Sequence, residues 1–111
     1  MIEENIVVAP PDKALPRIKN KMNGYWSAAN RLYIGATSNK EVRWAKHQRQ
    51  GWRRMVILYD AYTPEIAAKM ERALIDYARS CNFIVRSENI GPGGEGIVEE
   101  ARSNFIYLLL A

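Results

Sequence analysis

Apolar and polar residues alternate along the chain in short runs that predict strands and helices in turn. The run at 53–62, "RRMVILYDAY", is bounded by charge and dense in β-branched and aromatic residues, so it predicts a central strand. A similar run, "NFIYLLL" at 104–110, predicts a buried strand at the end of the chain. The shorter run "NIVVA" at 5–9 predicts another strand, which Pro10 and Pro11 end.

The stretch 23–38, "NGYWSAANRLYIGATS", predicts two short strands joined by a turn. Its Tyr, Trp, Leu and Ile residues favour a pleated, half-buried surface, and Asn30 suits the turn between them. The preceding segment "PRIKNKM" is typical of a basic connector. We therefore expect residues 1–22 to be an N-terminal extension of a core formed by residues 23–111.

A first helix is expected directly after the second of these strands. In "SNKE", Ser38 can accept a hydrogen bond from the backbone of Glu41, whose carboxylate reaches back to the Ser38 amide. The helix is expected to run to Gln50 and to stop at Gly51, a residue suited to the left-handed conformation.

A second helix is predicted at 63–80, "TPEIAAKMERALIDYARS", with Thr63 as its cap and Pro64 in its first position. Its charged residues form one stripe, but Glu71 lies about 120° from the centre of that stripe, beside apolar residues. A carboxylate in such surroundings loses hydration and needs compensation. Glu71 could be a boundary residue, the partner of an arginine, or a ligand for a divalent metal.

These elements predict a mixed α/β domain. Two strands, a helix, a strand, a second helix, a glycine-rich loop at 87–100 and a last strand fit a small sheet of three or four antiparallel or mixed strands flanked by helices. A chain of 111 residues is long enough for one core and too short for two, so a single domain covering residues 1–111 is expected.

The charge of the chain is mildly basic, +4 at pH 7, and is unevenly distributed. Six basic residues lie within a dozen positions: Arg43, Lys46, His47, Arg49, Arg53 and Arg54. This run is either a solvated helix face or a surface for a polyanion. Arg43 and His47 are four residues apart and project side by side from a helix, where a guanidinium suits a phosphate and an imidazole can move a proton.

The sequence also indicates a reducing compartment. Cys81 is the only cysteine, so an intrachain disulfide is excluded and the thiol is assigned to the core. The N-terminal residues lack the pattern of a signal peptide, and no apolar run approaches the roughly 20 residues that a membrane span requires. We therefore expect a cytoplasmic protein without membrane association.

Four motifs in this order resemble the GIY-YIG nuclease family. They are "YIG" at 33–35, "R-x-x-x-H" at 43–47, "A-x-x-x-E-x-x-L-I" at 67–75 and "N-x-x-x-GGEG" at 89–96. The resemblance covers roughly residues 24–110. No single motif is specific, but their order and their positions on the expected elements make the combination informative.

The resemblance implies a small metal-dependent endonuclease that hydrolyses DNA phosphodiester bonds. Tyr33 would lie near the attacking water or the scissile phosphate, and Arg43 would bind that phosphate. His47 would assist proton transfer or orient the nucleophile. Glu71 would hold a single Mg²⁺ or Mn²⁺ ion, and Asn89 would close the site.

The first motif of the family is less clear in this chain. The family carries a GIY about ten residues before the tyrosine of YIG, and the nearest match here is "NGYW", with Tyr25 eight positions before Tyr33. A hairpin two residues shorter keeps side-chain parity, so Tyr25 is either the first catalytic tyrosine or a core residue. The expected nucleic-acid surface comprises Arg43, Trp44, Lys46, Arg49, Arg53 and Arg54.

Two other interpretations stay open. The fold could serve as a catalytically silent module that binds nucleic acid or protein, or the motifs could match by accident in an α/β domain without this function. The expected partner is duplex or branched DNA, and the protein could act as a homodimer.

Overall fold

The computed structural model describes residues 2–81 and 104–111, and within them it shows a mixed four-stranded sheet with three helices. This confirms the predicted α/β class. The elements in chain order are β1 (Ile2–Glu4), α1 (Pro11–Trp26), β2 (Leu32–Thr37), α2 (Lys40–Gln48), β3 (Arg54–Ala61), α3 (Pro64–Ser80) and β4 (Asn104–Leu110).

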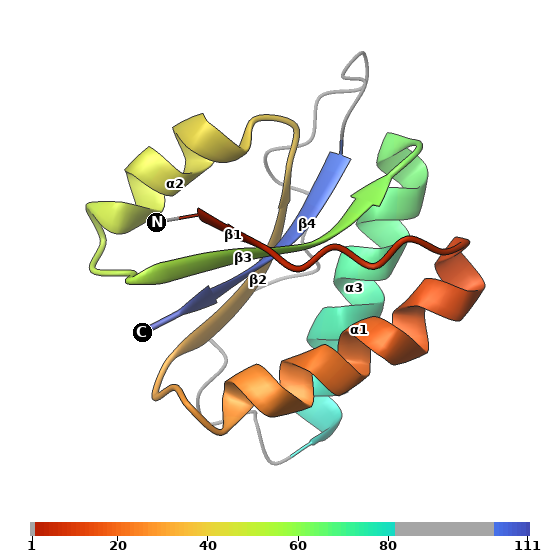
Figure 1. Ribbon diagram of the computed structural model, residues 1–111, viewed down its shortest axis with the longest axis horizontal. Coiled ribbons are helices and arrows are strands. Elements are labelled where there is room, and N and C mark those ends of the chain that lie inside the picture. Colours follow the sequence, from red (N-terminus) through yellow and green to blue (C-terminus); the bar gives the residue numbers. More distant parts are fainter. Residues whose placement is uncertain (1, 82–103) are drawn as a thin grey trace.

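The last strand of the chain lies in the interior of the sheet. The strand order is β1-β3-β4-β2, with β4 antiparallel to both of its neighbours and β1 parallel to β3 (Figure 1). In the register of β2 and β4, Gly35 is directly opposite Tyr107. Strand β2, which carries the "YIG" residues, therefore forms one edge of the sheet and is paired with the C-terminal strand.

The two faces of the sheet are covered by different helices. Helices α1 and α3 pack on one face, and α2 packs on the other (Figure 1). Because side chains alternate along a strand, Leu32 and Ile34 of β2 enter the core under α1 and α3, whereas Tyr33 packs with the residues under α2.

Helix α1 was not predicted from the sequence. Its buried residues Ala14, Ile18, Met22 and Trp26 recur every four positions, which is the pattern of a helix packed along one side. Pro11 occupies a first-turn position, where a proline costs no hydrogen bond. Residues assigned to a connector are thus part of the main core, and the proposed division at residue 22 is wrong.

The predicted hairpin around Asn30 is also wrong. Tyr25 and Trp26 form the end of α1, and the backbone continues in turns in which Ala28 N–H donates to the Tyr25 carbonyl and Ala29 N–H to the Trp26 carbonyl. Only Leu32–Thr37 is a strand. The helical spacing of apolar residues upstream outweighs the strand preference of Tyr and Trp.

The cap of α2 differs by one residue from the prediction. Asn39, not Ser38, is the N-cap, and its side chain accepts a hydrogen bond of 3.2 Å from the Val42 amide. The helix ends at Gln48, and Gly51 has a φ of +93°, the left-handed conformation expected of it.

The remaining predicted elements are confirmed with small differences in their limits. Thr63 caps α3 by accepting from the Ile66 amide at 3.1 Å, Pro64 is its first residue, and β3 and β4 occupy the predicted runs. The first strand lies at Ile2–Glu4 and not at 5–9. Cys81, assigned to the core, is half-buried just after α3.

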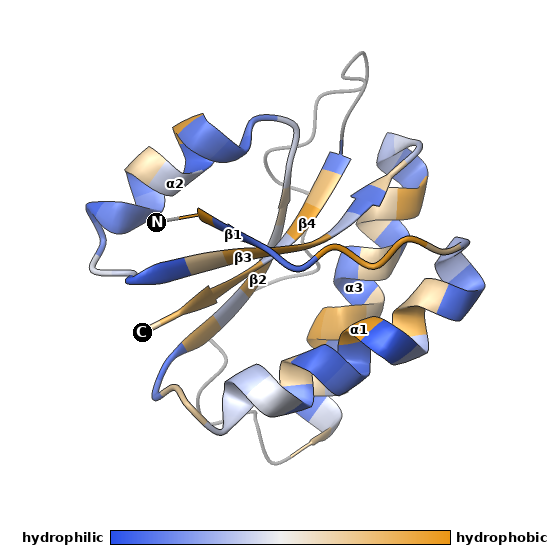
Figure 2. Ribbon diagram, in the orientation of Figure 1, coloured by the Kyte–Doolittle hydropathy of each residue, from blue (hydrophilic) through white to orange (hydrophobic). Residues whose placement is uncertain are grey.

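Hydropathy follows this layering. Figure 2 shows hydrophobic residues concentrated in the strands and on the sides of α1 and α3 toward the sheet, while α2 is mostly hydrophilic. None of the helices in the described part of the chain combines the length and apolarity that a bilayer span needs.

Candidate functional site

A pocket with a cavity volume of about 360 Å³ lies where α2 meets β2 and the start of β3. This volume is within the range of about 300–1,000 Å³ typical of ligand sites. Its lining residues are Arg31, Tyr33, Arg43, Lys46, His47, Gln50 and Trp52. Three of these described residues carry a full positive charge and none of them is a carboxylate, so this part of the lining favours an anion.

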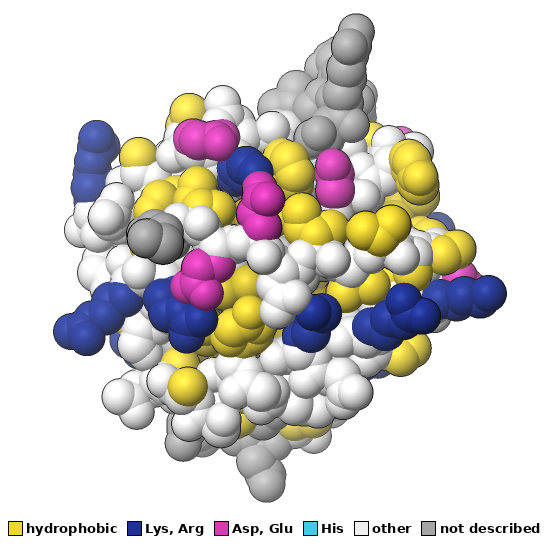
Figure 3. Space-filling view, in the orientation of Figure 1, with side chains coloured by type: hydrophobic (Ala, Val, Ile, Leu, Met, Phe, Trp, Pro, Cys, Tyr) yellow, Lys and Arg dark blue, Asp and Glu magenta, His cyan; other side chains and the backbone are white. Residues whose placement is uncertain are grey.

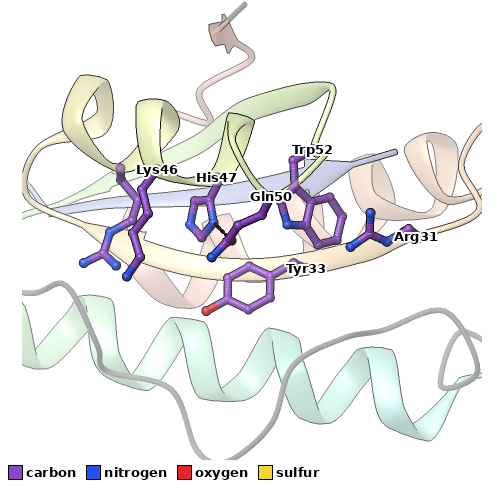
Figure 4. A pocket seen from close by; sticks show the side chains of 7 residues that line it. Arg31, Tyr33, Lys46, His47, Gln50 and Trp52 are labelled. Atoms are coloured by element: carbon purple, nitrogen blue, oxygen red, sulfur yellow. Dashed lines mark hydrogen bonds between the residues drawn. The ribbon is translucent and has the colours of Figure 1, made fainter.

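The sequence places these side chains together for simple geometric reasons. Arg43, Lys46, His47 and Gln50 are spaced by three, four and seven residues and so lie along one side of α2 and its C-terminal turn. Tyr33 projects from β2 toward the same space. In Figure 4, Tyr33 lies across the front of β2, below His47 and Gln50. Tyr33, Arg43 and His47, three of the residues predicted from the motifs, therefore meet at one pocket.

His47 is held by hydrogen bonds at both ring nitrogens. Its Nε2 lies 2.8 Å from the Tyr107 hydroxyl. Its Nδ1 lies 3.2 Å from Gln50 Oε1, the contact drawn as a dashed line in Figure 4. A hydroxyl and a side-chain amide can each donate or accept a hydrogen bond. Both neutral tautomers of His47 can therefore keep two hydrogen bonds, provided that the Gln50 amide rotates to present its oxygen or its nitrogen as required.

The pKa of His47 is lowered from its ordinary value of 6.5. Burial of the ring is the main cause, and the positive charges of Arg43 and Lys46 add to it, while the hydrogen bond to Gln50 acts in the opposite direction. His47 is 6% exposed. The imidazole is therefore neutral at pH 7, and Arg43 and Lys46 supply the positive charge at this end of the pocket.

Gly35, the glycine of "YIG", makes room for Tyr107. A Cβ atom at position 35 would lie 2.4 Å from both Cζ and the hydroxyl oxygen of Tyr107, a distance that non-bonded atoms do not adopt. The ring of Tyr107 can cross β2 toward His47 only because this side chain is absent. It lies 6.4 Å from the Tyr33 ring in a stacked arrangement at 28°.

Tyr107 is the residue that the sequence analysis missed. The prediction placed Tyr25 on the strand next to Tyr33, but the strand paired with β2 is β4, and its tyrosine is Tyr107. The sequence offered one signal: in "NFIYLLL" Tyr107 is two residues from both Phe105 and Leu109, so the three side chains are expected on the same face of the strand. Local sequence gives no indication that this distant strand pairs with β2.

Tyr25 lies on α1 and has a structural environment. Its hydroxyl accepts a hydrogen bond of 2.9 Å from Asn5 Nδ2, and the guanidinium of Arg54 lies 5.4 Å from its ring centroid. Arg54 in turn donates two hydrogen bonds, of 2.6 and 2.8 Å, to the carboxylate of Glu3. Tyr25 is not among the residues that line the pocket, so the structure does not bring it together with Tyr33 and Arg43, and the alternative of a packing residue fits its surroundings.

Glu71 is buried on α3, with 2% of its surface exposed. Helix α3 packs on the face of the sheet opposite α2, and Glu71 is not among the residues that line the pocket with Arg43. The described residues therefore give no support to the expected cleft between Glu71 and Arg43.

The described residues also do not assemble a recognisable metal centre. Within 2–81 and 104–111, no group of three or more His, Cys, Asp or Glu side chains is placed to hold an ion. The pocket itself offers cations and neutral donors, which do not fit a divalent metal. The Mg²⁺ or Mn²⁺ ion implied by the resemblance, with Glu71 as its candidate ligand, stays a prediction.

The other predicted contact residues differ in their positions. Lys46 lines the pocket, whereas Trp44 is 7% exposed and packs in the core under α2. Arg49 and Arg53 are exposed outside the pocket lining, and Arg54 pairs with Glu3. Asn89 and the glycine loop lie outside the described residues.

The basic charge of the chain is not gathered on the face viewed in Figures 1 and 3. Figure 3 shows Lys and Arg side chains across this face at the level of α1, with Asp and Glu side chains close above them. Elsewhere on the described surface, Lys40 and Glu4 form an ion pair of 2.5 Å. Mixed charges make a weaker anion site than the pocket, where the charged lining residues that the structure describes are all positive.

Comparisons with known proteins add no family to this description: no protein-family model, no curated protein and no solved structure matches the chain.

Proposed function

We propose that the chain is a small endonuclease that hydrolyses phosphodiester bonds of nucleic acid at the pocket between α2 and β2. The observation that supports this proposal is the lining of the pocket. Among the residues 2–81 and 104–111, three cationic side chains line the pocket with Tyr33 and His47, and no carboxylate joins them there. The order of the YIG and R-x-x-x-H motifs is consistent with this function.

Arg43 and Lys46 are assigned to the scissile phosphate. They lie three residues apart on α2, so both can reach one anion bound at this end of the pocket. A guanidinium binds two phosphate oxygens at once through its planar fork of donors. In the transition state negative charge grows on these oxygens, and fixed cations stabilise it more than they stabilise the bound substrate.

Tyr33 and His47 are assigned to the attacking water. Their rings are 5.5 Å apart, so a water molecule or substrate oxygen at the pocket can contact both. His47 is neutral at pH 7, and both of its ring nitrogens already have hydrogen-bond partners, so its role in this proposal is to orient the nucleophile beside Tyr33 and not to take the proton directly. Its two partners, Gln50 and the Tyr107 hydroxyl, keep the ring in place.

Plasmid cleavage tests the proposal. Purified protein with supercoiled plasmid and Mg²⁺ or Mn²⁺ is expected to produce nicked circles, and Arg43→Gln is expected to lower the rate about 100-fold or more because a fixed transition-state donor is lost. Arg49→Gln is the matched control, since Arg49 is exposed on the turn after α2 and does not line the pocket. A wild type inert on duplex, branched and single-stranded substrates contradicts the proposal.

A second candidate function is binding of nucleic acid without cleavage. It is favoured by the absence of Glu71 from the lining of the pocket. If wild type binds oligonucleotides with an Arg43-dependent affinity but cleaves none of them with any divalent ion, this function replaces the first. An unchanged melting temperature in millimolar Mg²⁺, for wild type and Glu71→Ala alike, supports the same conclusion.

A further inference from the structure

The positive charges of the pocket are located at two ends. In Figure 4, Lys46 lies at one end of the row of side chains and Arg31 at the other, with Tyr33 between them. Arg31 is two residues before Tyr33, so the two Cα atoms are separated by roughly 6.6 Å if the chain is extended there. A single phosphate that contacts Arg43 and Lys46 therefore leaves the Arg31 end of the cavity to another group.

The guanidinium of Arg31 is held in a defined position. Its Cζ lies 4.3 Å from the ring centroid of Trp52, which is itself 5% exposed. The Arg31 amide donates to the carbonyl of Ala111 at 3.0 Å, and the Ala111 amide donates to the Arg31 carbonyl at 3.2 Å. Stacking on an aromatic face fixes the plane of the guanidinium.

The side chain of Trp52 is in turn positioned by the end of α2. Gly51 adopts its left-handed conformation, and the Trp52 amide donates to the His47 carbonyl at 3.3 Å. The same turn thus places His47 and the platform of Arg31.

From this geometry we infer that Arg31 forms a second phosphate subsite, which binds the phosphate next to the scissile one on the same strand. The inference rests on the proposed function and narrows its substrate class. The substrate is an internal linkage of a nucleic-acid strand, bound through two successive phosphates, and not a mononucleotide or a terminal phosphate. A mononucleotide fills only one of the two cationic ends.

Binding of short oligothymidylates tests this subsite. Ligands without terminal phosphates and with one, two or three internal phosphates are titrated in EDTA, which prevents metal-dependent cleavage, and the dissociation constant is measured for each. Wild type is expected to gain about tenfold or more in affinity from one phosphate to two, the size of a charge-assisted contact, and little from two to three. Arg31→Gln is expected to lose this gain and to keep the affinity for one phosphate.

Two further variants separate the subsite from a general charge effect. Arg17→Gln removes an exposed arginine of α1, which packs on the other face of the sheet, and is expected to keep the gain. Arg31→Lys keeps the charge, so the slope of log affinity against log salt is expected to fall by about 0.7 in Arg31→Gln but not in Arg31→Lys. Thermal unfolding of each variant establishes that it is folded before the comparison is made.

The possible results distinguish the two proposals. If Arg31→Gln retains the gain from one phosphate to two, the second subsite is refuted while Arg43-dependent binding and cleavage stand. If wild type binds none of the ligands and cleaves no substrate, both proposals fail. A wild type that binds one phosphate as tightly as two also overturns the subsite.

Discussion

The two faces of the sheet differ in what fills them. Under α1 and α3 the core is mainly aliphatic, with Ile18, Met22, Leu74 and Leu108 essentially inaccessible to solvent. Under α2 the core is smaller and half aromatic: Trp44, Trp52 and Tyr107 pack with Met55, Ile57 and Leu109. The buried ring of His47 is hydrogen-bonded to the buried Tyr107 hydroxyl at this face. An apolar core needs only shape, whereas a buried polar pair also needs specific partners.

This difference indicates which face is specialised for chemistry. Both faces stabilise the fold, but only the α2 face combines buried polar groups with an adjoining cationic pocket. Matched substitutions on the two faces should therefore affect stability similarly and activity differently.

The largest effect is expected from Gly35→Ala. The added Cβ would lie 2.4 Å from the Tyr107 ring, so the ring must move. The hydrogen bond between the Tyr107 hydroxyl and His47 Nε2 must then lengthen or break. We expect a loss of about 1–3 kcal/mol in the free energy of unfolding, measured by urea denaturation, together with loss of nicking. Gly24→Ala on α1 is the control: no atom lies within 4 Å of its Cβ position, and alanine favours a helix, so stability should be unchanged or slightly higher.

A stable, fully active Gly35→Ala would show that Tyr107 and His47 need not be in contact.

The two faces can be compared by removing one buried tyrosine hydroxyl from each, with Tyr107→Phe under α2 and Tyr59→Phe on the other face. Tyr107→Phe leaves Nε2 of His47 without this hydroxyl partner, and we expect a loss of about 1–3 kcal/mol in unfolding free energy and a clear fall in the cleavage rate. Tyr59→Phe on the other face removes an equally buried hydroxyl, which donates to the Ala9 carbonyl at 2.6 Å. This variant should lose similar stability and keep its activity per folded molecule. Equal activity in the two variants would remove the functional distinction between the faces.

The smallest expected effect is a pH dependence of stability from His47. Its pKa is lowered in the folded state, so the unfolded chain binds the additional proton as pH falls below 6.5. The stabilising contribution is therefore complete above pH 6.5 and is lost as pH falls through the folded-state pKa. His47 is the only histidine, so urea denaturation of His47→Gln between pH 5 and 7.5 should show a flatter profile. An identical profile would mean that His47 titrates normally.

Much of the fold followed from local patterns in the sequence. The strand "RRMVILYDAY" and the helix begun by Thr63 and Pro64 combine strong periodicity with clear end signals, and the structure places both as expected. Helix α1 was missed because its four buried residues are separated by lysines, one arginine and a proline, a composition typical of a connector.

The candidate site was only partly predictable. Tyr33, Arg43 and His47 are close in sequence, and the strand-to-helix connection alone brings them to one pocket. Tyr107 and Arg31 were not predicted because their positions depend on β4 pairing with β2, a contact between distant segments. Long-range pairing of this kind depends on the whole topology and leaves little trace in a local pattern.

The most direct test of the proposed pocket is a two-dimensional NMR titration with a two-phosphate oligothymidylate in EDTA. Binding at the pocket predicts that signals of the Arg43 guanidinium, the His47 ring and Tyr33 shift together along one saturating curve. Signals of Arg54 and Tyr25, on the α1 side, should stay unchanged. Shifts confined to the α1 side, or no shifts at all, would contradict the assignment of this pocket to nucleic-acid phosphate.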